Sequence, residues 1–341
     1  MLFIKGIGCL LIALAIFSTF SMKAPKGDKA MNGLAGAAVA TFLVEALFKY
    51  IGGDLLEISF LGQVGEVAGG MGGTAAAALV PLMMGANPVF AVVAGVAASG
   101  SGILPGFIAG YAAYYISQLV DRYIPSGIDT IIGTLSLAAA SRAITTLTAP
   151  FITAVIGTIG NSITVAADQS PLVMGFVLGG IMKMVCTSPL SSMALTAMLD
   201  LKGLPMGIAS VACFGGAFSN GMVFRSLGIG NAGQILAVML EPLTQADLVT
   251  KNAIPMYSCN FFAGGFSGMI AASFGIISNA PGTASPIPGM LVPFAFNDPV
   301  KLCIVLALSA LCGVACGFAG SMLYRKTSVG KMIIRKTCAK A

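Results

Sequence analysis

The chain has 341 residues, of which 57% are hydrophobic and 9% are charged, and its mean hydropathy is +0.95. A water-soluble domain carries about 25% charged residues, so this composition excludes a soluble protein and indicates an integral membrane protein. The net charge of +6 does not indicate nucleic-acid binding. It arises largely behind the last apolar segment, and the positive-inside rule therefore predicts a basic cytoplasmic tail over residues 325–341.

The residue types for metal and proton chemistry are scarce. The sequence has no histidine, and none of its cysteines forms a CxxC pair. It therefore lacks the commonest general base and the commonest transition-metal ligand, and it has no zinc-type or redox cysteine motif. We expect no metal, no cofactor and no catalytic residues belonging to this chain alone.

Apolar segments fill nearly the whole chain. Each spanning helix needs about 20 apolar residues, and the pattern predicts an all-α polytopic protein with about eight to ten spans. The first segment, 1–22, is read as a retained span rather than a signal peptide, since no small-residue cleavage site follows it. The expected segments are 1–22, 31–52, 64–88, 89–123, 128–149, 150–166, 171–199, 203–224, a mixed stretch 225–254, 255–279 and 299–324.

Three stretches interrupt the apolar pattern with polar, glycine and proline residues. They lie at 160–171, 187–192 and 278–286. Non-helical backbone at membrane depth persists only where protein or a water-filled cavity satisfies its polar groups, and broken helices often line transporter sites. Each stretch is either such a break or an ordinary surface loop. Asn279, Thr283 and Ser285 in the third would offer the uncharged donors and acceptors that suit hydroxyl groups.

Two charged residues lie in unusual surroundings. Lys251 precedes a proline-containing helix start, where it could attract an anion or extend to the membrane interface. Glu66 lies among glycines, where it could contact a solute or cation, pair with a buried partner, or lie at an interface. Glu45 and Lys49 are one turn apart and are expected to form an i,i+4 pair without a site role.

Three ordered motifs carry a family resemblance over residues 60–320. The first is the glycine-rich run from Gly102 to Gly127, with Leu-Pro-Gly-Phe, a tyrosine cluster and Asp-Arg-Tyr-Ile-Pro. The second is Leu-Gly-Gly-Ile-Met at 178–182 followed by Pro189. The third is Asn-Ala-Ile-Pro-Met at 252–256, with Ala-Pro at 280–281 leading to Val-Pro-Phe at 292–294. Together they resemble the membrane-embedded EIIC component of the bacterial sugar phosphotransferase system, in particular its fructose-type members and the stand-alone perfringolysin-regulator (PfoR-like) branch.

The polar positions of these motifs differ from the family pattern. Lys251 stands where the fructose-type pattern has a glutamate, Gly282 stands at its histidine position, and Val185, Ser191 and Ser192 replace its aspartate and Asn-Lys pair. The scaffold is therefore expected to be kept, whereas phosphorylation coupling is left open. The breaks and the resemblance together give these candidate substrate-binding residues: Lys251, Asn252, Asn279, Thr283, Ser285, Glu66, Ser188 and Ser191.

The resemblance implies a fold, an organisation and partners. It implies an EIIC-like transporter fold with re-entrant hairpins, in which residues 1–140 form a dimer interface and residues 141–324 form the substrate-transport unit. It implies a homodimer in the bacterial inner membrane that moves a small polar solute, a sugar or sugar-like compound, by alternating access, with EIIA and EIIB on separate chains. The alternatives are a membrane ligand sensor or regulator, and an uncoupled transporter of a small anion.

Overall fold

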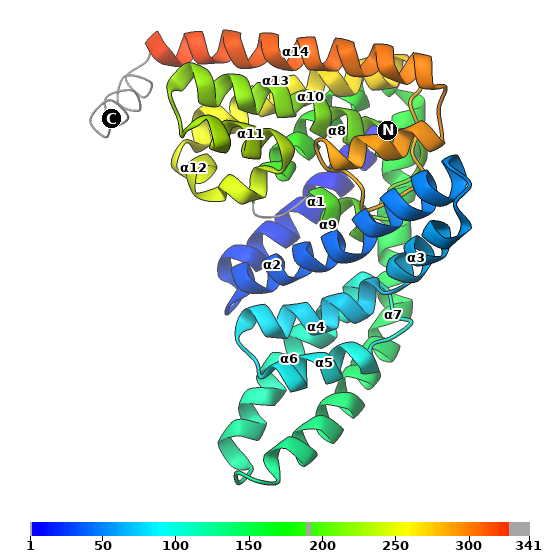
Figure 1. The fold of residues 1–341 in the computed structure, drawn as a ribbon, viewed down its shortest axis with the longest axis vertical. Helices are drawn as coiled ribbons and strands as arrows, with labels where there is room; N and C mark the ends of the chain where they lie inside the picture. The colour runs from blue at the N-terminus through cyan, green and yellow to red at the C-terminus, as the bar shows by residue number, and fades with distance from the viewer. Residues whose placement is uncertain (1, 189–191, 327–341) are drawn as a thin grey trace. The chain divides into compact units, whose positions relative to one another are not determined.

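The structure is a computed structural model that describes residues 2–188 and 192–326 (Figure 1). These residues are helical apart from connecting turns and one isolated β-bridge between Gly203 and Ser278. The helices in chain order are α1 (Leu2–Lys23), α2 (Gly27–Ala38), η1 (Val39–Leu43), η2 (Ala46–Leu55), α3 (Ser59–Gly70), α4 (Gly72–Met84), α5 (Pro88–Ala97), α6 (Ile103–Tyr123), α7 (Asp129–Gln169), α8 (Pro171–Cys186), α9 (Ser192–Met198), α10 (Gly203–Leu227), α11 (Ala232–Leu240), η3 (Pro242–Gln245), α12 (Ala246–Lys251), α13 (Ala253–Ser273), η4 (Pro288–Ala295) and α14 (Pro299–Lys326).

The helix lengths confirm an all-α polytopic membrane protein. Within the described residues, 6 helices are long and apolar enough to cross a membrane, or up to 7 when the bent pair α3–α4 counts as one span. This is fewer than the eight to ten spans expected, because several apolar segments form shorter helices such as α5 and α8. Helices α3 and α4 are separated by Met71, and their axes are bent by 56° at this break.

One expected break is absent. The sequence predicts separate spans at 128–149 and 150–166 and an interruption at Gly160–Ser162, but α7 continues as one helix of 41 residues. The prediction was wrong there because Pro150 removes one helical hydrogen bond without ending the helix, as membrane helices often tolerate. The helix ends only at Gln169, and Pro171 opens α8 at its first turn.

The described residues fall into two compact units. One, called the amino-proximal unit here, comprises Leu11–Gly160 and Met193–Asp200, and the other, called the carboxy-proximal unit, comprises Met1–Leu10, Asn161–Ser192 and Leu201–Ala341.

In the amino-proximal unit the turn before α2 is held against α4 and α6. Lys26 donates to the carbonyl of Met84 at 2.6 Å and lies 4.1 Å from the centre of the Tyr114 ring. The hydroxyls of Tyr111 and Tyr115 donate to the carbonyl of Pro25 at 2.9 and 3.1 Å. These contacts give the tyrosines of the glycine-rich motif a structural role in positioning the turn.

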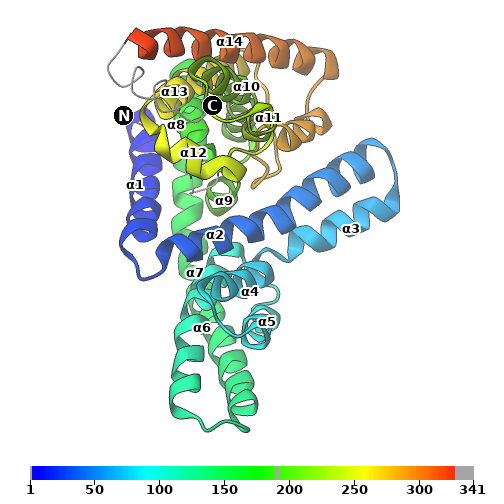
Figure 2. The ribbon, with the colours of Figure 1, turned by 60° about the vertical axis from the view of Figure 1, so that its left-hand side comes forward.

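The carboxy-proximal unit is organised around α8, α10, α13 and α14, which lie together in both views (Figures 1 and 2). Glycine allows these helices to approach closely, as small residues do in lipid. A Cβ at Gly175 would lie 2.6 Å from the carbonyl oxygen of Gly268, and one at Gly317 would lie 2.8 Å from that of Ser219. Gly175 therefore permits close packing of α8 on α13, and Gly317 permits close packing of α14 on α10.

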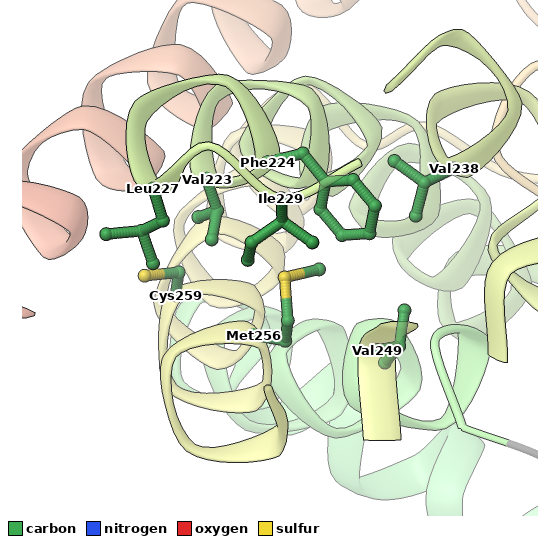
Figure 3. Close-up of a cluster of buried hydrophobic side chains, with 8 residues drawn as sticks. All are labelled: Val223, Phe224, Leu227, Ile229, Val238, Val249, Met256 and Cys259. Atoms are coloured by element: carbon green, nitrogen blue, oxygen red, sulfur yellow. The ribbon is translucent and has the colours of Figure 1, made fainter. Parts of the chain in front are cut away.

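This unit contains an apolar cluster formed by side chains of α10, α11, α12, α13 and the connection between α10 and α11 (Figure 3). Phe224 is at its centre and is fully buried, and Met256 and Val249 contribute side chains from the helices on either side of Asn252. The cluster therefore fixes the chain that leads from α12 into α13. Its members are Val223, Phe224, Leu227, Ile229, Val238, Val249, Met256 and Cys259.

Truncation of this cluster gives a stability prediction. Phe224→Ala is expected to lower the free energy of unfolding by about 3–5 kcal/mol, because a buried ring is lost and a cavity remains. The matched control is Phe318→Ala on α14, whose side chain is 51% exposed. Thermal unfolding of both purified variants checks the prediction, and an equal loss in the two would show that the cluster is not a packed core.

Candidate functional site

The residues in contact among α8, α10 and α13 form successive layers along the lengths of these helices. In the first layer, a Cβ at Gly179 would lie 2.5 Å from the Gly264 carbonyl oxygen and 3.3 Å from the Ala212 Cβ. One turn further, the aliphatic stem of Lys183 runs beside Gly216 and Gly264, where a Cβ at Gly216 would lie 2.5 Å from Lys183 Cγ. The glycines thus leave a slot that a lysine stem fills.

The next layer is a hydrogen-bonded network of uncharged side chains. The amide nitrogen of Asn260 donates to Thr187 Oγ1 at 3.1 Å and to Asn220 Oδ1 at 2.8 Å. All three side chains are buried, and Thr187 also donates to the carbonyl of Lys183 at 2.9 Å. Asn260 Oδ1 accepts no hydrogen bond from any described residue. One buried acceptor is therefore available for a hydroxyl donor.

The charged group of the site is Lys183, whose side chain has no exposed area. Its Nζ donates to the carbonyl oxygen of Cys213 at 3.3 Å. Cys213 in turn lies beside Ser192, with 3.8 Å between its Sγ and the Ser192 Oγ. A buried ammonium in a low-dielectric region costs several kcal/mol unless it is paired or hydrogen-bonded. A single long hydrogen bond to a carbonyl offsets little of that cost.

Two of the predicted breaks meet beside this lysine. Ser192, at the start of α9, donates to the carbonyl of Ala284 at 2.5 Å. Ala284 lies in the non-helical stretch between α13 and η4, and it is fully buried. The stretches at 187–192 and 278–286 are thus joined through described residues, as is typical of interrupted helices that form a solute site.

The polar residues predicted in the third stretch are placed at this junction but serve mainly to shape it. Asn279 accepts from the backbone nitrogen of Gly203 at 3.2 Å. Thr283 and Ser285 are buried; Thr283 donates to the Ala280 carbonyl at 2.8 Å, and Ser285 accepts from Gly289 N at 2.8 Å. Their hydrogen bonds hold the loop in its folded form next to Ala284.

The remaining predicted residues that the structure describes have other surroundings. Lys251, the last residue of α12, is exposed, and Asn252 donates to the Leu248 carbonyl one turn back at 2.8 Å. Ser188 donates to the Val185 carbonyl at 2.8 Å, and Ser191 lies outside the described residues. Glu66 is an exposed residue of the amino-proximal unit. The Glu45–Lys49 pair forms as expected, at 3.4 Å.

Sequence reasoning did not include Lys183, Thr187, Asn220 or Asn260 in the site. Lys183 lies in the last turn of α8, where a basic residue ordinarily complements the helix dipole, so its sequence position does not indicate a site. The available signal was the glycine content of the three helices, because Gly179 and Gly180 precede Lys183, Gly215 and Gly216 precede Asn220, and Gly264 and Gly265 follow Asn260.

Comparisons with known proteins identify a family. The family model described as phosphotransferase system, EIIC matches residues 28–334 of the chain. No curated protein and no solved structure matches the chain. The matched range begins at the second residue of α2 and extends past α14, and it includes both breaks and the buried network. The chain belongs to the EIIC family of the phosphotransferase system, and it is a multi-pass membrane protein of that family.

Proposed function

We propose that the chain is the permease of an EIIC-type system and that it moves a sugar or sugar-like solute by alternating access. The carboxy-proximal unit supplies the solute site, and the network of Thr187, Asn220 and Asn260 supplies hydrogen bonds to solute hydroxyls.

The observation that carries this proposal is the position of the network. A fully buried set of amides and hydroxyls costs free energy to maintain in an apolar helix bundle unless each polar atom has a partner. Here Asn260 Oδ1 has no partner among the described residues, and the two interrupted segments meet nearby. A hydroxylated solute would satisfy this acceptor, and movement of the interrupted segments would admit it.

The family supports a membrane transporter that works with EIIA and EIIB partners. We propose that these are separate chains, that the protein is a homodimer of the bacterial inner membrane with a cytoplasmic carboxyl terminus, and that residues 141–324 carry the solute while residues 1–140 carry the dimer interface. Phosphorylation coupling is a separate step, because the described residues contain no histidine to relay phosphate.

Uptake into proteoliposomes tests the proposal. Purified protein is reconstituted alone and supplied with radiolabelled D-fructose, D-glucose, D-mannitol, D-gluconate and D-glucuronate. We expect saturable uptake of at least one solute that unlabelled solute inhibits. Addition of soluble EIIA and EIIB with a phosphate donor then shows whether the product inside is phosphorylated.

The same assay separates the permease from the sensor that the perfringolysin-regulator resemblance suggests. Solute binding without uptake into vesicles, with or without EIIA and EIIB, would contradict transport and favour a ligand sensor. Uptake of a solute without phosphorylation would support the permease function and contradict coupling of transport to phosphorylation.

A further inference from the structure

Among the described residues of the carboxy-proximal unit, Lys183 is a buried positive charge that has no ion-pair partner. The acidic residues of this unit are Asp168, Glu241, Asp247 and Asp298. Asp168 and Asp298 are exposed, and no described residue forms an ion pair with Lys183. No described carboxylate therefore lies within 4.0 Å of the Lys183 ammonium.

The ammonium also has unused hydrogen-bonding capacity. A lysine head group has three donors, and the described residues provide it with one acceptor, the Cys213 carbonyl, at 3.3 Å. Its aliphatic stem lies against Gly216 and Gly264, where an added Cβ would overlap with Lys183 Cε and with Lys183 Cβ, respectively. The head lies at a buried position next to the Cys213 carbonyl and is not extended toward an interface.

The neighbouring layer contains an acceptor that lacks a donor, whereas the ammonium has donors that lack acceptors. Asn260 Oδ1 is a buried acceptor without a donor, one turn along the same helix interface from the layer of Lys183 and Gly264. A solute that satisfied both groups would carry an anionic oxygen for the ammonium and hydroxyl donors for the amide oxygen. Neutral sugars meet only the second requirement, and inorganic anions that carry no hydroxyl group meet only the first.

We propose that the solute of this permease is a sugar acid, a polyhydroxylated compound with one carboxylate, and that Lys183 holds the carboxylate. The inference rests on the proposed function, which it narrows from sugars in general to their acids. It places the anion-recognising charge on the buried Lys183 and not on Lys251, which is exposed. Lys183 is fully buried in this conformation, so the solute reaches it only when the unit opens.

Equilibrium binding to the full chain in lipid nanodiscs tests the inference. The ligands are two matched pairs, D-glucuronate with D-glucose and D-gluconate with D-glucitol, in which a carboxylate replaces a terminal CH₂OH group. In the wild type we expect the acid of at least one pair to bind roughly tenfold or more tightly than its neutral partner, as a charge-assisted hydrogen bond provides. Lys183→Met should remove this preference, while Lys251→Met should leave it unchanged.

Each alternative outcome overturns the inference. Tighter or equal binding of the neutral partners would do so while leaving the proposed permease intact, because the solute would then be a neutral sugar. A preference for acids that persists in Lys183→Met, or is lost in Lys251→Met, would show that Lys183 does not hold the carboxylate. If Lys183→Met does not fold, Lys183→Gln replaces it. The comparison of acids with neutral partners in the wild type still tests whether the solute is a sugar acid. The uptake assay with the same solutes judges the permease independently.

Discussion

Gly175→Ala is expected to destabilise the carboxy-proximal unit by about 3 kcal/mol, at the upper end of the range for overpacking a core. The added Cβ would lie 2.6 Å from the carbonyl oxygen of Gly268 and 3.0 Å from Met269 Cα. Both neighbours are backbone atoms, so no side chain can move aside and α8 must separate from α13. Loss of this contact would also shift Lys183 and Thr187, which lie further along α8. Thermal unfolding of the purified variant measures the effect.

Gly157→Ala is the control for this prediction. Gly157 is also inside a helix, α7, and a Cβ there meets nothing within 4 Å. We expect its stability to match the wild type or exceed it slightly, since alanine is the better helix former. Equal unfolding temperatures for Gly175→Ala and the wild type would contradict close packing of α8 on α13.

Asn260→Leu is expected to reduce solute uptake by roughly tenfold or more. The substitution keeps the branched side chain with the same number of heavy atoms but removes the amide that donates to Thr187 and Asn220 and the unpartnered oxygen offered to the solute. A single hydrogen bond to a buried partner is worth about 1–3 kcal/mol when one side is lost. Uptake into proteoliposomes, normalised to folded protein, measures the effect.

Asn252→Leu is the matched control. Asn252 is half-buried, its amide nitrogen donates to the Leu248 carbonyl in the preceding turn, and it belongs to the motif singled out in the sequence. We expect its uptake to stay within about twofold of the wild type, because a local helix bond contributes little to the solute site. The reverse order of effects would assign the site to the α12–α13 junction and not to the buried network.

The sequence predicts most of the architecture. Apolar composition and segment length identify an all-α membrane protein, and the apolar segment expected over 89–123 forms α5 and α6. Asn87 caps α5 through its side chain, with Pro88 at the first position, so the local signals agree with the fold there. The continuous α7 could not be predicted, because the effect of Pro150 depends on neighbours that only the tertiary structure supplies.

The site could be predicted only in part. The breaks at 187–192 and 278–286 follow from proline, glycine and polar residues, and the structure joins them through Ser192 and Ala284. The network itself needs three segments at once, since Thr187, at the end of α8, and Asn220 and Asn260, in apolar runs of α10 and α13, are far apart in the sequence. Helix phase alone does not show that they face one another. Lys183 illustrates the same limit, because its sequence position suggests a helix end and its packing shows a buried charge.

The measurement that tests the central claim most directly is photolabelling of the wild-type protein in membranes with diazirine derivatives of D-glucose and D-glucuronate, followed by mass spectrometry of the labelled peptides. The solute site proposed here predicts label within 183–192, 213–220, 256–264 or 278–286, displaced by excess unlabelled solute. Displaceable label confined to the segment around Lys251 and Asn252, or to the segment around Glu66, would contradict it.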